Sequence, residues 1–414
     1  MNQLTGACII GQSGGPTAVI NSSVLGAVQR ALCCESITRV LGAANGIEGI
    51  LNDRLYDMAQ EDPTELELLK YTPGAALGSC RYKMADFRKD DSDYLRLLEI
   101  FRKYDVRYFF YNGGNDSMDT CNKISKFMQE SGYDCSVIGI PKTIDNDLVG
   151  TDHCPGFGSA ARFIATSCME IQQDLQVYEK GRVTIVEIMG RHAGWLAGSA
   201  GLATCLGAGP DLIYLPEVDF DMSRFLEDVS WIYGEKGSCM VAVSEGIKDF
   251  AGKFIADAGV GGPDVFGHTQ LGGLSATLAD IVQRKTGLKV RGIELSLLQR
   301  CASHVASKTD IDEACMAGSA AVEAALAGES DKMVGFERFA GEDGGYCCRT
   351  RLVPLGEVAN AEKCVPREWI NEAGNGVEQD LIDYLLPLIQ GEVDRQTECS
   401  LPRFARLKKV RVIS

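Results

Sequence analysis

Short apolar runs alternate with amphipathic stretches along most of the chain. This alternation is typical of repeated strand–helix–strand units that build a mostly parallel sheet. The predicted strands cover residues 7–10, 106–111, 135–140, 182–189, 212–215, 239–243 and 290–298. The predicted helices cover residues 18–32, 93–104, 117–129, 157–177, 192–203, 223–232, 277–285, 312–326 and 377–389. The pattern therefore predicts an α/β fold.

The number of predicted units indicates more than one domain. A chain of 414 residues is long enough for two or three domain-sized units. We expect two Rossmann-like, three-layer α/β lobes with mostly parallel sheets around a central cleft, divided at residues 1–140 and 141–330, with the chain crossing between them. Because the pattern weakens beyond residue 330, we expect residues 331–414 to form a C-terminal extension that packs on the lobes.

Composition narrows the class of protein. Hydrophobic residues make up 45% and charged residues 24%, as in an ordinary soluble globular protein. The net charge of −16 argues against a nucleic-acid partner, because phosphate backbones bind a basic face. No apolar run approaches 18 residues and no leader sequence precedes the first strand, so we expect a cytoplasmic protein without a membrane partner. The sixteen cysteines include no CxxC pair, which argues against a zinc site.

The most informative segment is residues 141–147, Pro-Lys-Thr-Ile-Asp-Asn-Asp, directly after a predicted buried strand. Ligands of open α/β sheets bind at this end of the strands. A carboxylate there can take a proton from an alcohol while a cation stabilises a migrating phosphoryl group. In an extended chain Asp145 and Asp147 project to the same side. Asp-Asn-Asp also suits a turn, but the neighbouring Lys142 and Thr143 favour a chemical role.

Two glycine-rich turns follow other predicted strands. The first contains Gly14 and Gly15 and opens a helix, where backbone N–H groups favour an anion. It is not a P-loop, because no Gly-Lys-Ser/Thr follows. The second turn has the sequence Gly113, Gly114, Asn115, Asp116, Ser117. Either turn alone is explained by chain reversal or helix capping, but two at adjacent strand ends favour a shared phosphate site.

These motifs, with Met189-Gly190-Arg191, resemble the 6-phosphofructokinase family in content and order over about residues 5–330. The resemblance implies phosphoryl transfer to the 1-hydroxyl of fructose 6-phosphate, with Asp145 as general base and the remaining catalytic groups beside it. It implies a first lobe that holds the phosphoryl donor and a second lobe that holds the sugar phosphate. The implied catalytic residues are Asp145, Lys142, Asp147 and Arg191. The implied sugar-phosphate contacts are Thr143, Asp145, Asp147, Met189, Gly190, Arg191, Glu245, Arg182, Arg291 and Arg300.

Some of the family's phosphate-binding arginines come from a neighbouring subunit, so the resemblance also implies a homodimer or homotetramer. The family uses magnesium, and Asn115 stands at the position of its magnesium-associated aspartate, with Asp116 expected to take over part of that role. Asn115 replaces an aspartate there and is a weaker ligand for a hard cation.

Two positions resemble the pyrophosphate-dependent branch of the family. Asp116 stands where ATP-dependent enzymes have a glycine, and its carboxylate would repel the α-phosphate of a nucleotide. Lys142 also replaces a glycine and would neutralise the departing phosphate. The implied donor contacts are Gly14, Gly15, Arg81, Gly114, Asp116 and Ser117. Residues 264–273 resemble another element of this branch, in which His268 has a structural role.

Alternatives remain open at this point. One is an ATP-dependent enzyme of the same fold, which Asp116 and Lys142 oppose. Another is a non-catalytic regulatory subunit, which the intact Asp145 and Lys142 oppose. Leu297 replaces a substrate-contacting histidine of the family, which weakens fructose 6-phosphate binding or admits a related acceptor such as sedoheptulose 7-phosphate.

Overall fold

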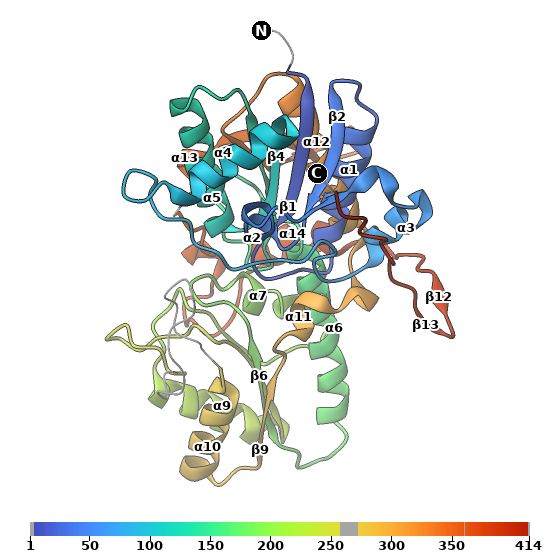
Figure 1. Cartoon of the computed structure of the whole chain (residues 1–414). Coiled ribbons are helices and arrows are strands. Elements are labelled where there is room, and N and C mark those ends of the chain that lie inside the picture. The colour runs from blue at the N-terminus through green and yellow to red at the C-terminus, as the bar shows by residue number, and fades with distance from the viewer. Residues whose placement is uncertain (1–3, 257–271, 360, 413–414) are drawn as a thin grey trace.

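The structure is a computed structural model that describes residues 4–256, 272–359 and 361–412. Two lobes each contain one large sheet, and helices cover the faces of both (Figure 1). The first sheet has the order β11-β10-β5-β4-β1-β2-β3. Its strands are β1 (Gly6–Gln12), β2 (Ile37–Ala43), β3 (Leu55–Asp57), β4 (Val106–Gly113), β5 (Ser136–Pro141), β10 (Lys332–Ala340) and β11 (Tyr346–Pro354).

The second sheet has the order β7-β8-β6-β9, and all its pairings are parallel. Its strands are β6 (Val183–Ile188), β7 (Leu212–Tyr214), β8 (Cys239–Ser244) and β9 (Val290–Glu294). In the first sheet only β3 and β11 run antiparallel to their neighbours. A small hairpin joins β12 (Thr397–Glu398) and β13 (Leu401–Pro402). The predicted α/β class with mostly parallel sheets is confirmed.

Helices lie on the faces of the sheets and at the junction of the lobes. They are α1 (Ile20–Leu32), α2 (Gly46–Leu51), α3 (Pro63–Glu67), α4 (Ser92–Tyr104), α5 (Asn115–Glu130), α6 (Phe157–Leu175), α7 (Trp195–Gly198), α8 (Gly201–Thr204), α9 (Met222–Lys236), α10 (Leu274–Thr286), α11 (Leu298–Cys301), α12 (Lys308–Leu326), α13 (Leu355–Val358) and α14 (Gln379–Leu385). The central strands β1, β5, β6 and β8 are buried along their whole length. This burial explains their near-continuous apolar sequences.

The predicted boundary at residue 330 differs from the observed pairing. Strand β10 pairs with β5, and β11 pairs with β10, so residues 332–354 complete the first sheet. Helix α12 also packs against α1 of the first lobe. The β10–β5 pairing joins segments about 190 residues apart, and the α1–α12 contact joins segments about 290 residues apart, so local patterning does not reveal them.

Two predicted elements differ in detail. The helix predicted at 192–203 is divided into α7 and α8, and the glycines on either side of the break, Gly198 and Gly201, lie against side chains of the C-terminal segment. The strand predicted to end at residue 298 ends at Glu294, because Ser296 adopts a φ of 46° and α11 begins at Leu298.

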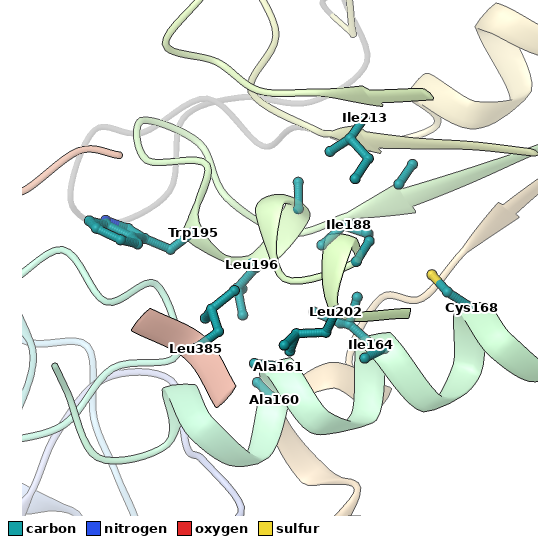
Figure 2. Packing of buried hydrophobic residues seen from close by; sticks show 14 of the residues in the cluster. Ala160, Ala161, Ile164, Cys168, Ile188, Trp195, Leu196, Leu202, Ile213 and Leu385 are labelled. Atoms are coloured by element: carbon teal, nitrogen blue, oxygen red, sulfur yellow. The ribbon is translucent and has the colours of Figure 1, made fainter. Parts of the chain in front are cut away.

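A large apolar cluster joins the second lobe to the C-terminal segment. Figure 2 shows Leu385 of α14 packed beside Leu196 of α7 and Ala161 of α6, and all three residues are fully buried. This packing fixes α14 at the junction of the lobes, close to the ends of the central strands. Within the described part of the chain, every helix is too short or too polar to cross a membrane.

Candidate active site

A cleft of about 1190 Å³ lies where the carboxyl ends of strands from both sheets meet. The turns after β1, β4 and β5 line one side, and the segments after β6, β8 and β9 line the other. The lining residues are Ser13, Gly14, Gly15, Pro16, Thr17, Arg81, Gly114, Asn115, Asp116, Ser117, Lys142, Thr143, Ile144, Asp145, Asp147, Glu187, Met189, Arg191, His192, Glu245, Glu294, Ser296, Leu297, Gln299, Arg300 and Glu362.

Lys142 connects the three turns of the first sheet. Its side chain is only 4% exposed, and Nζ donates a hydrogen bond to the carbonyl oxygen of Gly15 at 2.6 Å. Its backbone N–H donates to the carbonyl oxygen of Gly113 at 3.0 Å. The ammonium group is therefore held against the first glycine-rich turn, and the backbone of Lys142 is joined to the second.

The loop after Lys142 is bent. The prediction that Asp145 and Asp147 project to the same side assumed an extended chain, and that assumption is wrong. Asn146 adopts a left-handed conformation with φ of 56°, and the N–H of Asp145 donates to Thr143 Oγ1 at 3.0 Å. Asp145 and Asp147 nevertheless both line the cleft. Among the described residues, Oδ1 of Asp147 is buried without a hydrogen-bond partner, which leaves an acceptor for a ligand.

Burial sets the protonation of these groups. Burial, reinforced by the Asp145 carboxylate, raises the pKa of Asp147 to about 7. Burial also raises the pKa of Asp145, although Lys142 opposes this shift. Burial lowers the pKa of Lys142 to about 8, against the attraction of the two carboxylates. Near neutral pH the cleft therefore combines a carboxylate with raised basicity and an ammonium group, the pair that proton abstraction beside a migrating anion requires.

The glycine-rich turns bring backbone close to the cationic side chains. Gly14 has a φ of 75°, and a Cβ atom at Gly15 would lie 2.7 Å from Nη1 of Arg300. The second turn leads into α5, so Asp116 and Ser117 occupy the first turn of that helix, where N–H groups favour anions. The residues expected to bind the donor therefore share one wall of the cleft with Lys142.

The opposite wall carries the predicted sugar-phosphate contacts. The N–H of Met189 donates to Oε1 of Gln299 at 3.1 Å, and the N–H of Gly190 donates to Oε1 of Glu245 at 3.3 Å. Burial raises the pKa of Glu245 to about 7. Burial, followed by the charge of Arg81, lowers the pKa of Arg300, which shows that the two guanidinium groups share an electropositive region.

Two predicted contacts lie away from this cleft. Arg182 directly precedes β6 and pairs with Asp174, and Arg291 lies opposite Thr184 near the start of β9. Both are therefore at the amino ends of their strands. Met189 follows the carboxyl end of β6, about 20 Å further along at the rise of an extended strand. Neither arginine lines the cleft of its own chain.

Other lining residues were not predicted. Glu187 and Glu294 come from within β6 and β9, where strand patterning hides their role. Glu362 comes from the C-terminal segment, whose weak periodicity gave no signal. Leu297, which the resemblance had already singled out, lines the cleft and is 55% exposed. The predicted structural His268 lies outside the described residues.

A cleft between two α/β lobes that pairs a basic carboxylate with a buried ammonium suits a phosphotransferase. The phosphofructokinase family model matches residues 7–325. Two relatives named pyrophosphate–fructose 6-phosphate 1-phosphotransferase are similar over nearly their whole length. The one from Halomonas elongata is 44% identical over 97% of this chain and 96% of its own, and the one from Xanthomonas campestris is 45% identical over 98% and 97%.

A similar solved structure supports the same family. The crystal structure of a pyrophosphate-dependent phosphofructokinase from Nitrosospira multiformis superposes with a TM-score of 0.88, at 39% identity, covering 99% of this chain and 98% of that one. The chain belongs to the phosphofructokinase family, as its motifs predicted.

Proposed function

We infer that this protein transfers a phosphoryl group from pyrophosphate to the 1-hydroxyl of fructose 6-phosphate. The products are fructose 1,6-bisphosphate and phosphate, and the reaction runs in both directions. The observation that carries this inference is the buried ammonium of Lys142, held against the first glycine-rich turn and beside the Asp145–Asp147 pair. The names of the similar proteins from Halomonas and Xanthomonas support the same donor and acceptor.

Asp145 is the general base in this mechanism. It takes the proton of the sugar's 1-hydroxyl as the oxygen attacks the terminal phosphorus of pyrophosphate in line with the leaving phosphate. The bond from its N–H to Thr143 fixes the start of the loop. Lys142, Arg81 and Arg191 stabilise the charge that moves from donor to acceptor. Asp147 lies beside the base and accepts a hydrogen bond from the sugar.

The acceptor is held by the wall after β6 and β8. Met189, Gly190 and Glu245 contact the sugar, and Arg300 binds its 6-phosphate through a bidentate guanidinium fork. Arg182 and Arg291 complete the phosphate site of a neighbouring subunit in a homodimer or homotetramer. This assignment gives a reason for their place at the far end of the second sheet.

The donor wall fits pyrophosphate better than ATP. Backbone N–H groups around Gly14, Gly15 and Gly114 approach the phosphates, while Ser117 lies in the first turn of α5. The Asp116 carboxylate occupies the space a nucleotide's α-phosphate needs and repels it, whereas Lys142 attracts the small dianionic leaving group. Attraction toward one donor and repulsion of the other together set the preference.

Magnesium fits the residues at this wall. Asn115 Nδ2 donates to the carbonyl oxygen of Ala361 at 2.6 Å, which fixes the orientation of the amide. An amide oxygen and the Asp116 carboxylate are hard donors, and the phosphates supply further oxygens. Bound there, Mg²⁺ would neutralise phosphate charge. The sixteen free thiols are consistent with a reducing cytoplasm as the place of action.

One assay tests the function. Fructose 6-phosphate is offered with Mg²⁺ and either pyrophosphate or ATP, and fructose 1,6-bisphosphate is measured. We expect turnover with pyrophosphate, and a loss of about 10³-fold in Asp145→Asn relative to the surface control Asp312→Asn. Turnover with ATP alone would overturn the donor assignment. A wild-type protein inactive with both donors would favour a regulatory subunit.

A further inference from the structure

The residue between the two carboxylates has an unusual conformation and a fully engaged side chain. Asn146 is completely buried and has a φ of 56°. Its Oδ1 accepts a hydrogen bond from the N–H of Cys154 at 3.0 Å. Its Nδ2 donates to the hydroxyl of Tyr384 at 2.9 Å. Asparagine tolerates left-handed backbone better than most residues, and here both ends of its amide hold that conformation in place.

Tyr384 is itself fixed on every side. Its hydroxyl accepts from Asn146 and donates to the carbonyl oxygen of Asp152 at 2.7 Å, so both functions of the hydroxyl are used. The ring packs against Trp195 and Trp369, with centroids 5.3 and 5.4 Å away. Burial raises the pKa of Tyr384 well above its usual value, so the phenol stays neutral and keeps its proton for the bond to Asp152.

The same C-terminal segment also holds the far end of the loop. The N–H of Lys363 donates to the carbonyl oxygen of Asp147 at 2.8 Å, and Lys363 Nζ donates to that of Asp152 at 2.7 Å. The indole of Trp195 donates to the carbonyl oxygen of Lys363 at 2.8 Å. The bend that carries both cleft carboxylates is therefore clamped by residues 361–389, which lie outside the range matched by the family model.

We propose that Tyr384 is a positioning residue for phosphoryl transfer, acting through Asn146 to fix the bend that aims Asp145 and Asp147 into the cleft. This proposal rests on the proposed function. Tyr384 does not line the cleft and touches no reacting group. Its effect should therefore appear in turnover, and through Asp147 in the KM for fructose 6-phosphate, but not in the KM for pyrophosphate.

The first test is Tyr384→Phe, which keeps the ring and removes only the hydroxyl. The matched control is Tyr133→Phe, because the Tyr133 hydroxyl also contacts two backbone carbonyl oxygens, those of Phe101 and Val106, but away from the cleft. With pyrophosphate as donor we expect Tyr384→Phe to lower kcat about 10-fold, with the KM for pyrophosphate within about 2-fold of wild type. Tyr133→Phe should leave both parameters within about 2-fold. Equal kcat in the two variants would overturn the proposal.

The second test is a double-mutant cycle with Asn146→Gly. Glycine accepts the left-handed backbone but has no amide to hold it. We expect Asn146→Gly to lower kcat about 10-fold, and the double variant with Tyr384→Phe to be no slower than Asn146→Gly within about 2-fold. Independent, multiplicative losses would contradict action through Asn146. If Tyr384→Phe does not fold, a kcat of Asn146→Gly equal to that of the wild type would overturn the proposal.

The proposed function and the role of Tyr384 can each fail without the other. If wild-type protein does not use pyrophosphate, the proposed function fails before either variant is compared. If wild-type protein is active and only unfolding temperature differs between Tyr384→Phe and wild type, the function stands and Tyr384 has a structural role alone.

Discussion

Three charged groups in the wall of the cleft, the buried Lys142 and the half-buried Asp145 and Asp147, determine the chemistry at the scale of residues. Two carboxylates in one buried site cannot both ionise easily, and their basicity rises together. Lys142 offsets part of that cost, and burial brings its own pKa down toward neutrality. Since the two carboxylates interact, they titrate as a pair with shared apparent pKa values. The site is consequently poised for proton transfer within a narrow range of pH.

This arrangement predicts a bell-shaped dependence of kcat/KM on pH. Activity should fall as pH drops below about 7, because the carboxylate pair takes up a proton, and again above about 8, because Lys142 loses its proton. Each limb should approach about a tenfold loss per pH unit. Steady-state rates measured between pH 5.5 and 9.5 test this pH dependence of kcat/KM.

Lys142→Arg is the matched variant, since a guanidinium does not deprotonate in this range. Its alkaline limb should disappear while its acidic limb remains, whatever its maximal rate. A wild-type rate that stays constant from pH 7 to 9.5 would show that Lys142 is not the group responsible.

At the scale of elements, close packing of α1 on α12 joins distant parts of the first lobe. A Cβ atom at Gly318 would lie 1.9 Å from the carbonyl oxygen of Ser23, and one at Gly26 would lie 2.0 Å from that of Cys315. The two glycines therefore let the helix backbones touch. This contact holds residues 308–326 on the first lobe after the chain has passed through the second.

Gly318→Ala should accordingly destabilise the protein by roughly 1–3 kcal/mol, since the helices must separate to admit a methyl group. Gly234→Ala is the control, because Gly234 lies in the exposed part of α9 with open space around its Cβ position. That change should stabilise by about 0.5–1 kcal/mol through helix propensity. Urea unfolding measures both. Destabilisation of the same size at Gly234 would contradict the packing argument.

Element-level patterns were predictable where the sequence signal is local. The strand before Lys142 and the helix after Gly114 follow from apolar runs and turn residues, so the wall that carries both glycine-rich turns could be predicted from sequence alone. Strand β10 could not, since its partner β5 lies some 190 residues earlier and its outer neighbour β11 is half-exposed. The bend at Asn146 was also beyond reach, because its left-handed backbone depends on Tyr384, far away in sequence.

At the scale of the whole molecule, the cleft is incomplete in one chain if three arginines bind the 6-phosphate. Arg300 lines the cleft, whereas Arg182 and Arg291 lie at the opposite ends of their strands. The acidic net charge of −16 makes a local concentration of arginine necessary for an anionic substrate. Sharing residues between subunits would supply it.

Subunit complementation tests this sharing. Arg182→Ala alone should raise the KM for fructose 6-phosphate at least about 10-fold, because a charge-assisted phosphate contact is lost. Coexpression with the inactive Asp145→Asn chain should restore a low-KM fraction of activity, since one site of a mixed dimer has both Asp145 and Arg182. A monomeric mass in light scattering, or no low-KM fraction in the mixture, would contradict subunit sharing.

The most direct test of phosphoryl transfer by this cleft is a crystal structure with fructose 6-phosphate and imidodiphosphate, a non-transferable analogue of pyrophosphate. We predict a carboxylate oxygen of Asp145 within about 3 Å of the sugar's 1-hydroxyl oxygen, with the ammonium of Lys142 against the analogue. A structure in which Asp145 is turned away from that hydroxyl, or in which the analogue binds elsewhere, would contradict the mechanism.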